Sequence, residues 1–320
     1  MEKIFGISKT KKEVSSLDTP NGHILITGKS GTGKTYAIFN LIVQAVANNI
    51  PVVIIDVGNS FENNQISANI KNFVEGRLIV YNAVDRPLPV NPFFWGNIES
   101  KENQKIVEIS NRISDILKRC LKLGMQQRNE IYKAIMSVFS SNDSITFQKV
   151  SDRLEEMKKN PAKTAAEKLL PLITGVSFSD KNDSLNSMLY GNPKVHIFQL
   201  SGLSNEVKKI VSDFILFSLI EEIRRNGSTE KNFILVLDEL QNINCGDSTP
   251  LTKILTEGRK FGVECICATQ FMKSKNTDII SILEQSATRV FFKPNDSEIA
   301  SVAKYLSNIL KADWQYILKS

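Results

Sequence analysis

The chain has 320 residues, of which 42% are hydrophobic and 23% are charged, and its formal net charge is +6. This composition excludes a wholly disordered chain and suffices for one large or two modest globular domains. The positive excess is modest for the length and gives only weak support for a polyanionic partner.

The apolar segments and the cysteines exclude further classes. The segment 210–223 contains three acidic residues, and it falls short of the roughly 18 apolar residues of a membrane span. The N-terminus lacks the apolar core of a signal peptide. The four cysteines lack metal-finger spacing, which favours reduced core residues over a zinc site. We therefore expect a cytoplasmic protein with no membrane segment of its own.

The first predicted strand leads into a phosphate-binding loop. Residues 23–27 form an apolar run typical of a buried strand, and residues 36–47 have the apolar content of a helix. The sequence between them fits the pattern G-x-x-x-x-G-K-[ST] in the strand, loop and helix context that it requires. Its residues are Gly28, Lys29, Ser30, Gly31, Thr32, Gly33, Lys34 and Thr35.

This loop has the chemistry that a nucleotide triphosphate needs. Glycines let the backbone turn tightly and direct several N–H groups at one anion, and the helix start adds partial positive charge. We expect Lys34 to contact the β and γ phosphates and Thr35 to bind Mg²⁺. The motif therefore predicts ATP and Mg²⁺ as ligands. A chance match in a glycine-rich turn is disfavoured by the flanking elements.

Two more strands are predicted at residues 51–56 and 77–81. Asp56 ends the first of them, and two interpretations explain it equally well. It could bond water near a bound metal, or it could be a solubilising acid at a strand end.

A helical segment follows the proline-rich residues 86–92. Between residues 97 and 190 the apolar side chains recur at helical spacing, and no strand-like run interrupts them convincingly. We predict an all-helical insertion domain, 97–190, within a core formed by residues 1–96 and 191–320. A packing or spacer role is the preferred hypothesis for this insertion.

An acidic pair ends a later strand. Residues 233–237 are apolar without alternation, which is typical of a strand covered on both faces in a parallel sheet. Asp238 and Glu239 then fall at its C-terminal end, the edge where parallel α/β sheets bind ligands. We expect Asp238 to bind Mg²⁺ and Glu239 to polarise the attacking water. The alternative, a pair that only caps the next helix, is disfavoured by the phosphate loop upstream.

Strand-like runs at residues 194–200, 263–269 and 288–292 complete the pattern. Strands that alternate with helices predict an α/β fold with a mainly parallel sheet and helices on both faces.

The most specific resemblance lies in residues 255–270. A helix ending in Glu-Gly-Arg-Lys-Phe-Gly precedes a strand ending in Ala-Thr-Gln. This arrangement resembles the HerA/FtsK superfamily of hexameric DNA-translocating ATPases, which includes type IV secretion and conjugation motors. Residues 23–35, residues 52–58 and the Asn-Pro-Phe turn within 88–93 are similar to the same superfamily. The resemblance implies a RecA-like P-loop NTPase of the additional-strand, catalytic-glutamate (ASCE) type.

The resemblance also implies catalytic roles beside those of Lys34 and Glu239. Gln270 would sense the γ phosphate, whereas the alternative is a strand-end polar residue that bonds the backbone. Arg259 would act as an arginine finger in the site of the neighbouring subunit. If Arg259 only neutralises the end of its own helix, Arg289 becomes the candidate finger.

The resulting hypothesis is an ATPase motor that assembles as a homohexameric ring and couples ATP hydrolysis to translocation on DNA. A kinase is disfavoured, because a kinase would exclude the water that Glu239 is placed to activate. The alternatives are a nucleotide-gated ring scaffold that clamps DNA or a partner nuclease, and a conjugation or secretion ATPase acting on protein or DNA. The first predicted strand begins at residue 23, so we expect a motor core without the N-terminal barrel of HerA or the membrane anchors of FtsK. Its accessory partner could be a nuclease or a component of a secretion or defence system.

Overall fold

The computed structural model describes the following residues: 3–7, 11–15, 22–61, 74, 76–94, 102–141, 144–179, 183–192, 194–226, 233–246, 248–271 and 286–307. The chain divides into two compact units. The first consists of Met1–Val80, Asn186–Gln199 and Glu222–Ser320, and the second of Tyr81–Leu185 and Leu200–Glu221. These bounds differ from those of the predicted insertion, 97–190, which remains a prediction as a domain.

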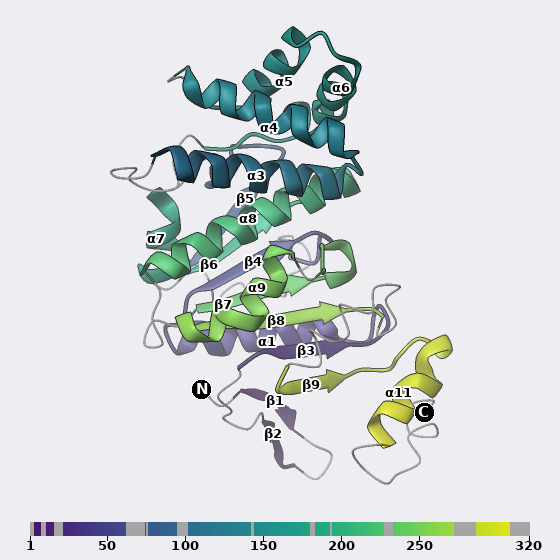
Figure 1. Ribbon diagram of the computed structural model, residues 1–320. Coiled ribbons are helices and arrows are strands. Elements are labelled where there is room, and N and C mark those ends of the chain that lie inside the picture. The colour runs from purple at the N-terminus through teal and green to yellow at the C-terminus, as the bar shows by residue number, and fades with distance from the viewer. Residues whose placement is uncertain are drawn as a thin grey trace. The chain divides into compact units, whose positions relative to one another are not determined.

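A seven-stranded sheet, in the order β5-β6-β4-β7-β8-β3-β9, is the centre of the first unit (Figure 1). The ladders β3–β8, β3–β9, β4–β6, β4–β7 and β7–β8 are all parallel. The strands are β3 (Ile24–Thr27), β4 (Val52–Asp56), β5 (Leu78–Asn82), β6 (Val195–Gln199), β7 (Phe233–Asp238), β8 (Val263–Thr269) and β9 (Thr288–Phe291). The predicted α/β fold with a mainly parallel sheet is thus confirmed.

The sheet is covered on both faces, which explains why its central strands are apolar runs. Helix α1 (Lys34–Ala47) buries Ile38 and Leu41 in a core cluster that also contains Ile54 of β4 and Val236 of β7. In Figure 1, α1 lies behind the strands and α9 (Pro250–Glu257) lies in front of them. Alternate residues of a strand point to opposite faces, so the remaining apolar side chains of the same strands are buried on the other face.

A short antiparallel hairpin, β1 (Ile4–Ile7) and β2 (Glu13–Ser15), was not predicted from the sequence. Side chains of α1 hold it. Gln44 Nε2 donates to the carbonyl oxygen of Ile4 at 2.6 Å, and Gln44 Oε1 accepts from the N–H of Ile4 at 2.8 Å. The strands are short and lack an apolar alternation, so the contact that fixes them comes from residues far along the chain.

The described part of residues 102–190 consists of helices and their connections and contains no strand, and its Phe178 forms an isolated bridge with Leu88. The helices are α3 (Glu102–Cys120), α4 (Met125–Ser140), α5 (Phe147–Glu156), α6 (Asn160–Gly175) and α7 (Asp183–Tyr190). Two further helices are α8 (Asn205–Asn226) and α11 (Ile299–Ser307).

The second unit has its own core. The ring of Phe147 lies 4.7 Å from Phe93, 5.8 Å from Phe178 and 5.5 Å from Phe214, measured between centroids. The fully buried carboxylate of Asp213 accepts a 2.9 Å hydrogen bond from Arg119, as a buried charge requires.

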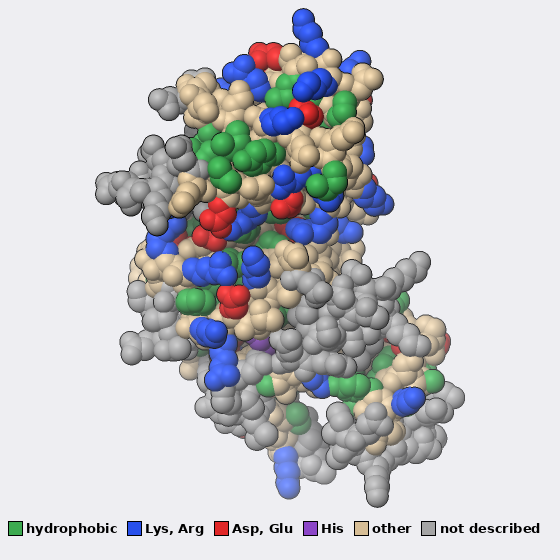
Figure 2. Space-filling view, viewed as in Figure 1, with side chains coloured by type: hydrophobic (Ala, Val, Ile, Leu, Met, Phe, Trp, Pro, Cys, Tyr) green, Lys and Arg blue, Asp and Glu red, His purple; other side chains and the backbone are tan. Residues whose placement is uncertain are grey.

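The surface gives a limited indication of partners. On the face in Figure 2, the described Lys and Arg side chains are interspersed with Asp, Glu and apolar ones. Within the described ranges, no helix combines the length and the apolar character that a membrane crossing needs.

Candidate nucleotide-binding site

A cavity of about 320 Å³ lies in the first unit at the C-terminal ends of β3, β7 and β8. Eight of the residues that line it were predicted from the sequence: Ser30, Gly31, Gly33, Lys34, Thr35, Asp238, Glu239 and Gln270. Three more, Tyr36, Ser60 and Thr269, were not. The cavity therefore brings together residues that are far apart in the sequence.

The register of the sheet explains this convergence. Thr27 of β3 pairs with Thr269 of β8, and Asp56 of β4 pairs with Asp238 of β7. Because these strands are parallel and end at the same level, the residues that follow them meet at one edge of the sheet.

The phosphate loop has the backbone conformation that its glycines permit. Gly31 and Gly33 have φ angles of 77° and 105°, in the left-handed region that glycine adopts at little cost. Gly28 must be glycine for a steric reason, because a Cβ there would lie 2.5 Å from Cβ of Phe292. The loop after β9 also accepts a 2.8 Å hydrogen bond from the N–H of Lys29 through the carbonyl oxygen of Lys293.

Lys34 begins α1 and is only 8% exposed. Its Nζ donates to the carbonyl oxygen of Lys29 at 2.9 Å, and the hydroxyl of Thr32 donates to the same oxygen at 2.8 Å. Burial lowers the pKa of Lys34, while the negative charges of Asp238 and Glu239 oppose that shift. The ammonium group is thus held at the cavity by a hydrogen bond to the phosphate loop itself.

Glu239 has an unusual backbone. Its φ and ψ angles are 56° and 53°, a left-handed conformation that a glutamate adopts only under constraint. Its N–H donates to Oδ1 of Asp238 at 2.9 Å, and Asp238 is 3% exposed. The turn directs the two neighbouring carboxylates of one strand end into the same cavity.

Two amides hold the carboxylate of Glu239. Asn242 Nδ2 donates to Oε2 at 2.8 Å, and Gln270 Nε2 donates to Oε1 at 3.2 Å. The carboxylate also lies against Gly58, where an added Cβ would be 2.5 Å from Cδ of Glu239. Sequence reasoning missed Asn242 and Gly58. The spacing of three residues after Glu239 is a signal for Asn242, whereas only the tertiary structure identifies Gly58.

Gln270 is held at its backbone as well as at its side chain. Its carbonyl oxygen accepts from Asn295 Nδ2 at 3.0 Å, and its N–H donates to Oε1 of Gln241 at 3.5 Å. Its side-chain amide bonds the Glu239 carboxylate, not the backbone as the alternative interpretation required. Asn295 was also missed, because it lies 25 residues further along the chain.

Asp56 is fully buried, so the interpretation as a solubilising acid is wrong. Its carboxylate accepts hydrogen bonds from the N–H groups of Gly58, Ser60 and Phe61 at 3.0–3.2 Å. Burial raises the pKa of Asp56, and these three hydrogen bonds oppose the shift. The residue holds the turn that brings Ser60 to the cavity and Gly58 to the carboxylate of Glu239.

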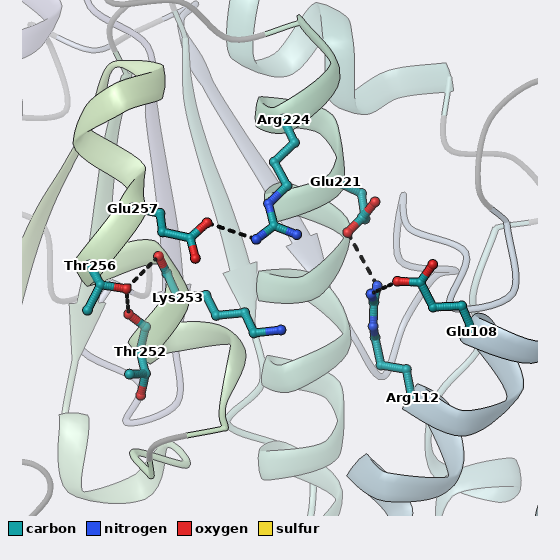
Figure 3. Close-up of polar contacts among 8 residues, drawn as sticks. All are labelled: Glu108, Arg112, Glu221, Arg224, Thr252, Lys253, Thr256 and Glu257. Atoms are coloured by element: carbon teal, nitrogen blue, oxygen red, sulfur yellow. Dashed lines mark hydrogen bonds and ion pairs between the residues drawn. The ribbon is translucent and has the colours of Figure 1, made fainter. Parts of the chain in front are cut away.

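The two candidate arginines occupy different environments. Arg259 is exposed on the short 3-10 helix η2 (Gly258–Phe261) and is not part of the cavity lining. Just before it, Glu257 accepts a 2.8 Å hydrogen bond from Arg224 of α8 (Figure 3), and this bond holds the pKa of Glu257 below its usual value. Arg289 lies on β9, where it bonds the hydroxyl of Tyr305 and lies 5.6 Å from the ring centroid.

Comparison with known proteins gives one family and one fold. Residues 16–219 match the sequence model of the family described as "Helicase HerA, central domain". The DNA double-strand break repair helicase HerA of Sulfolobus acidocaldarius is 23% identical over 295 residues, which cover 86% of this chain and 56% of the relative. The chain therefore spans about half the length of that curated relative.

Two solved structures are similar in fold. VirB4 of Thermoanaerobacter pseudethanolicus has a TM-score of 0.69 and 14% identity, over 97% of this chain and 88% of that chain. The plasmid coupling protein TrwB, in complex with the non-hydrolysable ATP analogue ADPNP, has a TM-score of 0.62 and 15% identity, over 89% and 73% of the respective chains. Both matches show the RecA-like P-loop fold. Because the family match extends over well more than half of the sequence, the chain belongs to the HerA helicase central-domain family.

Proposed function

We propose that this protein is a ring-forming ATPase of the HerA/FtsK type, which couples ATP hydrolysis to translocation on DNA. One observation carries the proposal: Lys34, Asp238, Glu239 and Gln270 line the same cavity at the C-terminal edge of a parallel sheet. This set combines a cation for phosphates, an acid for a metal, an acid for water and an amide near both.

The residues present fit ATP and Mg²⁺. Glycines with positive φ and the start of α1 suit a polyphosphate. The hydroxyl of Thr35 and the carboxylate of Asp238 line the cavity and are the oxygen ligands that Mg²⁺ prefers. When bound, the metal would neutralise negative charge on the transferring phosphoryl group.

Each side chain has a distinct task in this proposal. Lys34 binds the β and γ phosphates, and Glu239 orients and polarises the water that attacks the terminal phosphorus. Gln270 follows β8, the strand between β7 and β3, and bonds Glu239, so its amide would report the γ phosphate to the carboxylate. Arg259, which is exposed and outside this cavity, would complete the site of a neighbouring subunit.

Family membership supports DNA as the substrate, together with a cytoplasmic location and assembly as a homohexamer. The net charge of +6 is compatible with a polyanionic track but does not require one. An accessory protein, such as a nuclease or a secretion or defence component, would select the cargo.

The test is the rate of ATP turnover with and without duplex DNA, measured over a series of salt concentrations. Contacts to DNA phosphates release counterions, so stimulation of a translocase should be strong and should fall steeply as salt rises. Glu239→Gln is the control for contaminating ATPases. If DNA does not change the rate of ATP turnover at any salt concentration, translocation is contradicted and a scaffold or a protein-secretion motor is favoured.

A further inference from the structure

Glu239 is held in a position that its own backbone does not favour. Its left-handed φ of 56° is uncommon and energetically unfavourable for a residue other than glycine. Such a conformation persists only where surrounding contacts determine it. The contacts around the Glu239 side chain therefore bear directly on where its carboxylate lies.

Those contacts leave the carboxylate capable of accepting more hydrogen bonds. One oxygen accepts from Asn242 and the other from Gln270, at 2.8 and 3.2 Å. An ionised carboxylate has about four acceptor positions. One amide on each oxygen thus fixes the plane of the group while leaving lone pairs for water.

Gly58 makes a third close contact with the carboxylate. An added Cβ would lie 2.5–2.9 Å from Cδ and both oxygens of Glu239. Gly58 does not have positive φ, so its backbone conformation alone does not call for glycine. The space beside it is needed by the carboxylate. The three hydrogen bonds from its turn to Asp56 hold that backbone in place.

The two amides differ in what holds them. Gln270 is anchored by Asn295 and Gln241 at the end of β8. Asn242 belongs to the 3-10 turn η1 (Leu240–Asn242) that follows Glu239, and its own N–H donates to the carbonyl oxygen of Glu239 at 2.8 Å. The backbone of this turn therefore holds the side-chain amide of Asn242 within hydrogen-bond distance of the Glu239 carboxylate.

We propose that Asn242 is a positioning residue that holds the Glu239 carboxylate against Gly58, in the orientation that activates water. This inference rests on the proposed function of Glu239. Asn242 acts through Glu239 and does not line the cavity itself. Loss of its amide should slow hydrolysis and leave nucleotide binding intact.

The first test uses Asn242→Ala and Asn242→Asp in the full chain. Asparagine and aspartate have similar size and similar preference for turns, but aspartate has no N–H donor and adds a like charge beside Glu239. We expect kcat for ATP to fall about 10- to 100-fold in both variants, because small misplacements of catalytic groups cause losses of this size. KM and the affinity for a non-hydrolysable ATP analogue, measured by calorimetry, should change less than about threefold, because no phosphate contact is lost.

Asn226→Ala is the matched control. Asn226 Nδ2 donates to Oε1 of Glu222 at 2.7 Å, so the control removes an amide–carboxylate bond of the same kind outside the cavity. It should keep the wild-type kcat. If Asn242→Asp also keeps the wild-type kcat, the amide donor has no role and the proposal is overturned. An increase in kcat would overturn it too, since Asn242 would then restrain Glu239.

Gly58→Ala provides an independent test through a different contact of the carboxylate. We expect the same loss of kcat with analogue affinity retained, because the methyl group would displace Glu239. Gly246→Ala is its control, since a Cβ at Gly246 would meet only Cγ2 of Thr249 at 3.8 Å. A Gly58→Ala protein with wild-type turnover would contradict the close contact on which the proposal depends.

Two comparisons separate this inference from the proposed function. If the wild type does not hydrolyse ATP, the function itself fails. If the wild type is active, Glu239→Gln is inactive and both Asn242 variants behave as wild type, only the inference fails. Thermal melting without nucleotide shows whether each variant is folded. If both Asn242 variants are folded and lose analogue affinity, the positioning role is refuted, and if neither folds, wild-type turnover of Gly58→Ala refutes it.

Discussion

Lys34 and Glu239 line one cavity but have different contacts, and those contacts predict different losses. Lys34 Nζ bonds a carbonyl oxygen of the phosphate loop, whereas Glu239 is held by amides of other segments. We expect Lys34→Ala to weaken binding of a non-hydrolysable ATP analogue about 10- to 100-fold, the effect of one charge-assisted hydrogen bond.

Glu239→Gln should have the opposite profile. The amide is similar in size but cannot act as a base, so kcat should fall at least about 100-fold while analogue affinity stays near the wild-type value. Calorimetry and a steady-state assay on the two variants check both predictions. Equal loss of affinity in both would refute the separate tasks assigned to them.

At this scale the sequence predicted most of the cavity lining. The phosphate loop and the Asp238–Glu239 pair are local patterns whose chemistry follows from adjacent residues. Gly58, Asn242 and Asn295 escaped prediction because their significance depends on contacts with Glu239 or Gln270, which the fold creates. The sequence left two interpretations of Asp56 open for the same reason, since its burial, which excludes the solubilising acid, depends on the strands on either side of it.

His23 connects three elements of the first unit, which are β3, β8 and α9. It precedes β3, its Nδ1 accepts from the N–H of Cys265 in β8 at 3.0 Å, and its Nε2 donates to the carbonyl oxygen of Leu255 in α9 at 3.1 Å. This pattern requires the neutral ring. Burial lowers its pKa, the positive charge of Lys3 adds to the shift, and the Leu255 carbonyl and Glu264 oppose it.

His196, in β6, gives the clearer pH prediction. Burial, with a smaller contribution from the positive charge of Lys194, lowers its pKa from 6.5 to about 4. Between these values the unfolded chain binds a proton that the folded chain does not, so the free energy of unfolding should decrease as pH falls from 6.5 towards 4. Denaturant unfolding of wild type and His196→Gln at several pH values checks this.

The comparison with His196→Gln isolates the histidine. Asp56, whose pKa is raised, increases the free energy of unfolding as pH falls. This contribution is the same in both proteins. The wild type should lose more stability than His196→Gln between pH 7 and pH 5. Parallel pH profiles would show that His196 is protonated equally easily in the folded and unfolded chains.

At the scale of the whole molecule, the proposed ring predicts that one active site uses residues of two subunits. Arg259 is exposed and away from the cavity of its own chain, as a residue serving a neighbour would be. Arg259→Ala and Glu239→Gln proteins should each be inactive alone. Mixed together, they should regain part of the ATPase activity, because some interfaces then combine an intact Arg259 with an intact Glu239.

The mixture must first be shown to contain both variants in one assembly, for example by co-purification through a tag on one of them. A verified mixed ring that remains inactive would exclude Arg259 as the residue shared across the interface. The same mixture made with Arg289→Ala would then test the second candidate. If the contact of Arg289 with Tyr305 serves only the fold, a mixture of Arg289→Ala and Glu239→Gln should not regain ATPase activity.

The sequence by itself determined which segments form the strands of a mainly parallel sheet and the chemistry at their ends. These features can be recognised in the sequence because they are local patterns: apolar runs, glycine spacing and adjacent carboxylates. The tertiary structure decided the strand order, the attachment of the β1–β2 hairpin and the surroundings of Glu239. These depend on contacts between residues distant in the chain, such as Gln44 with Ile4 and Gly58 with Glu239. Such contacts leave no local pattern, because their free energy arises only when the chain is folded.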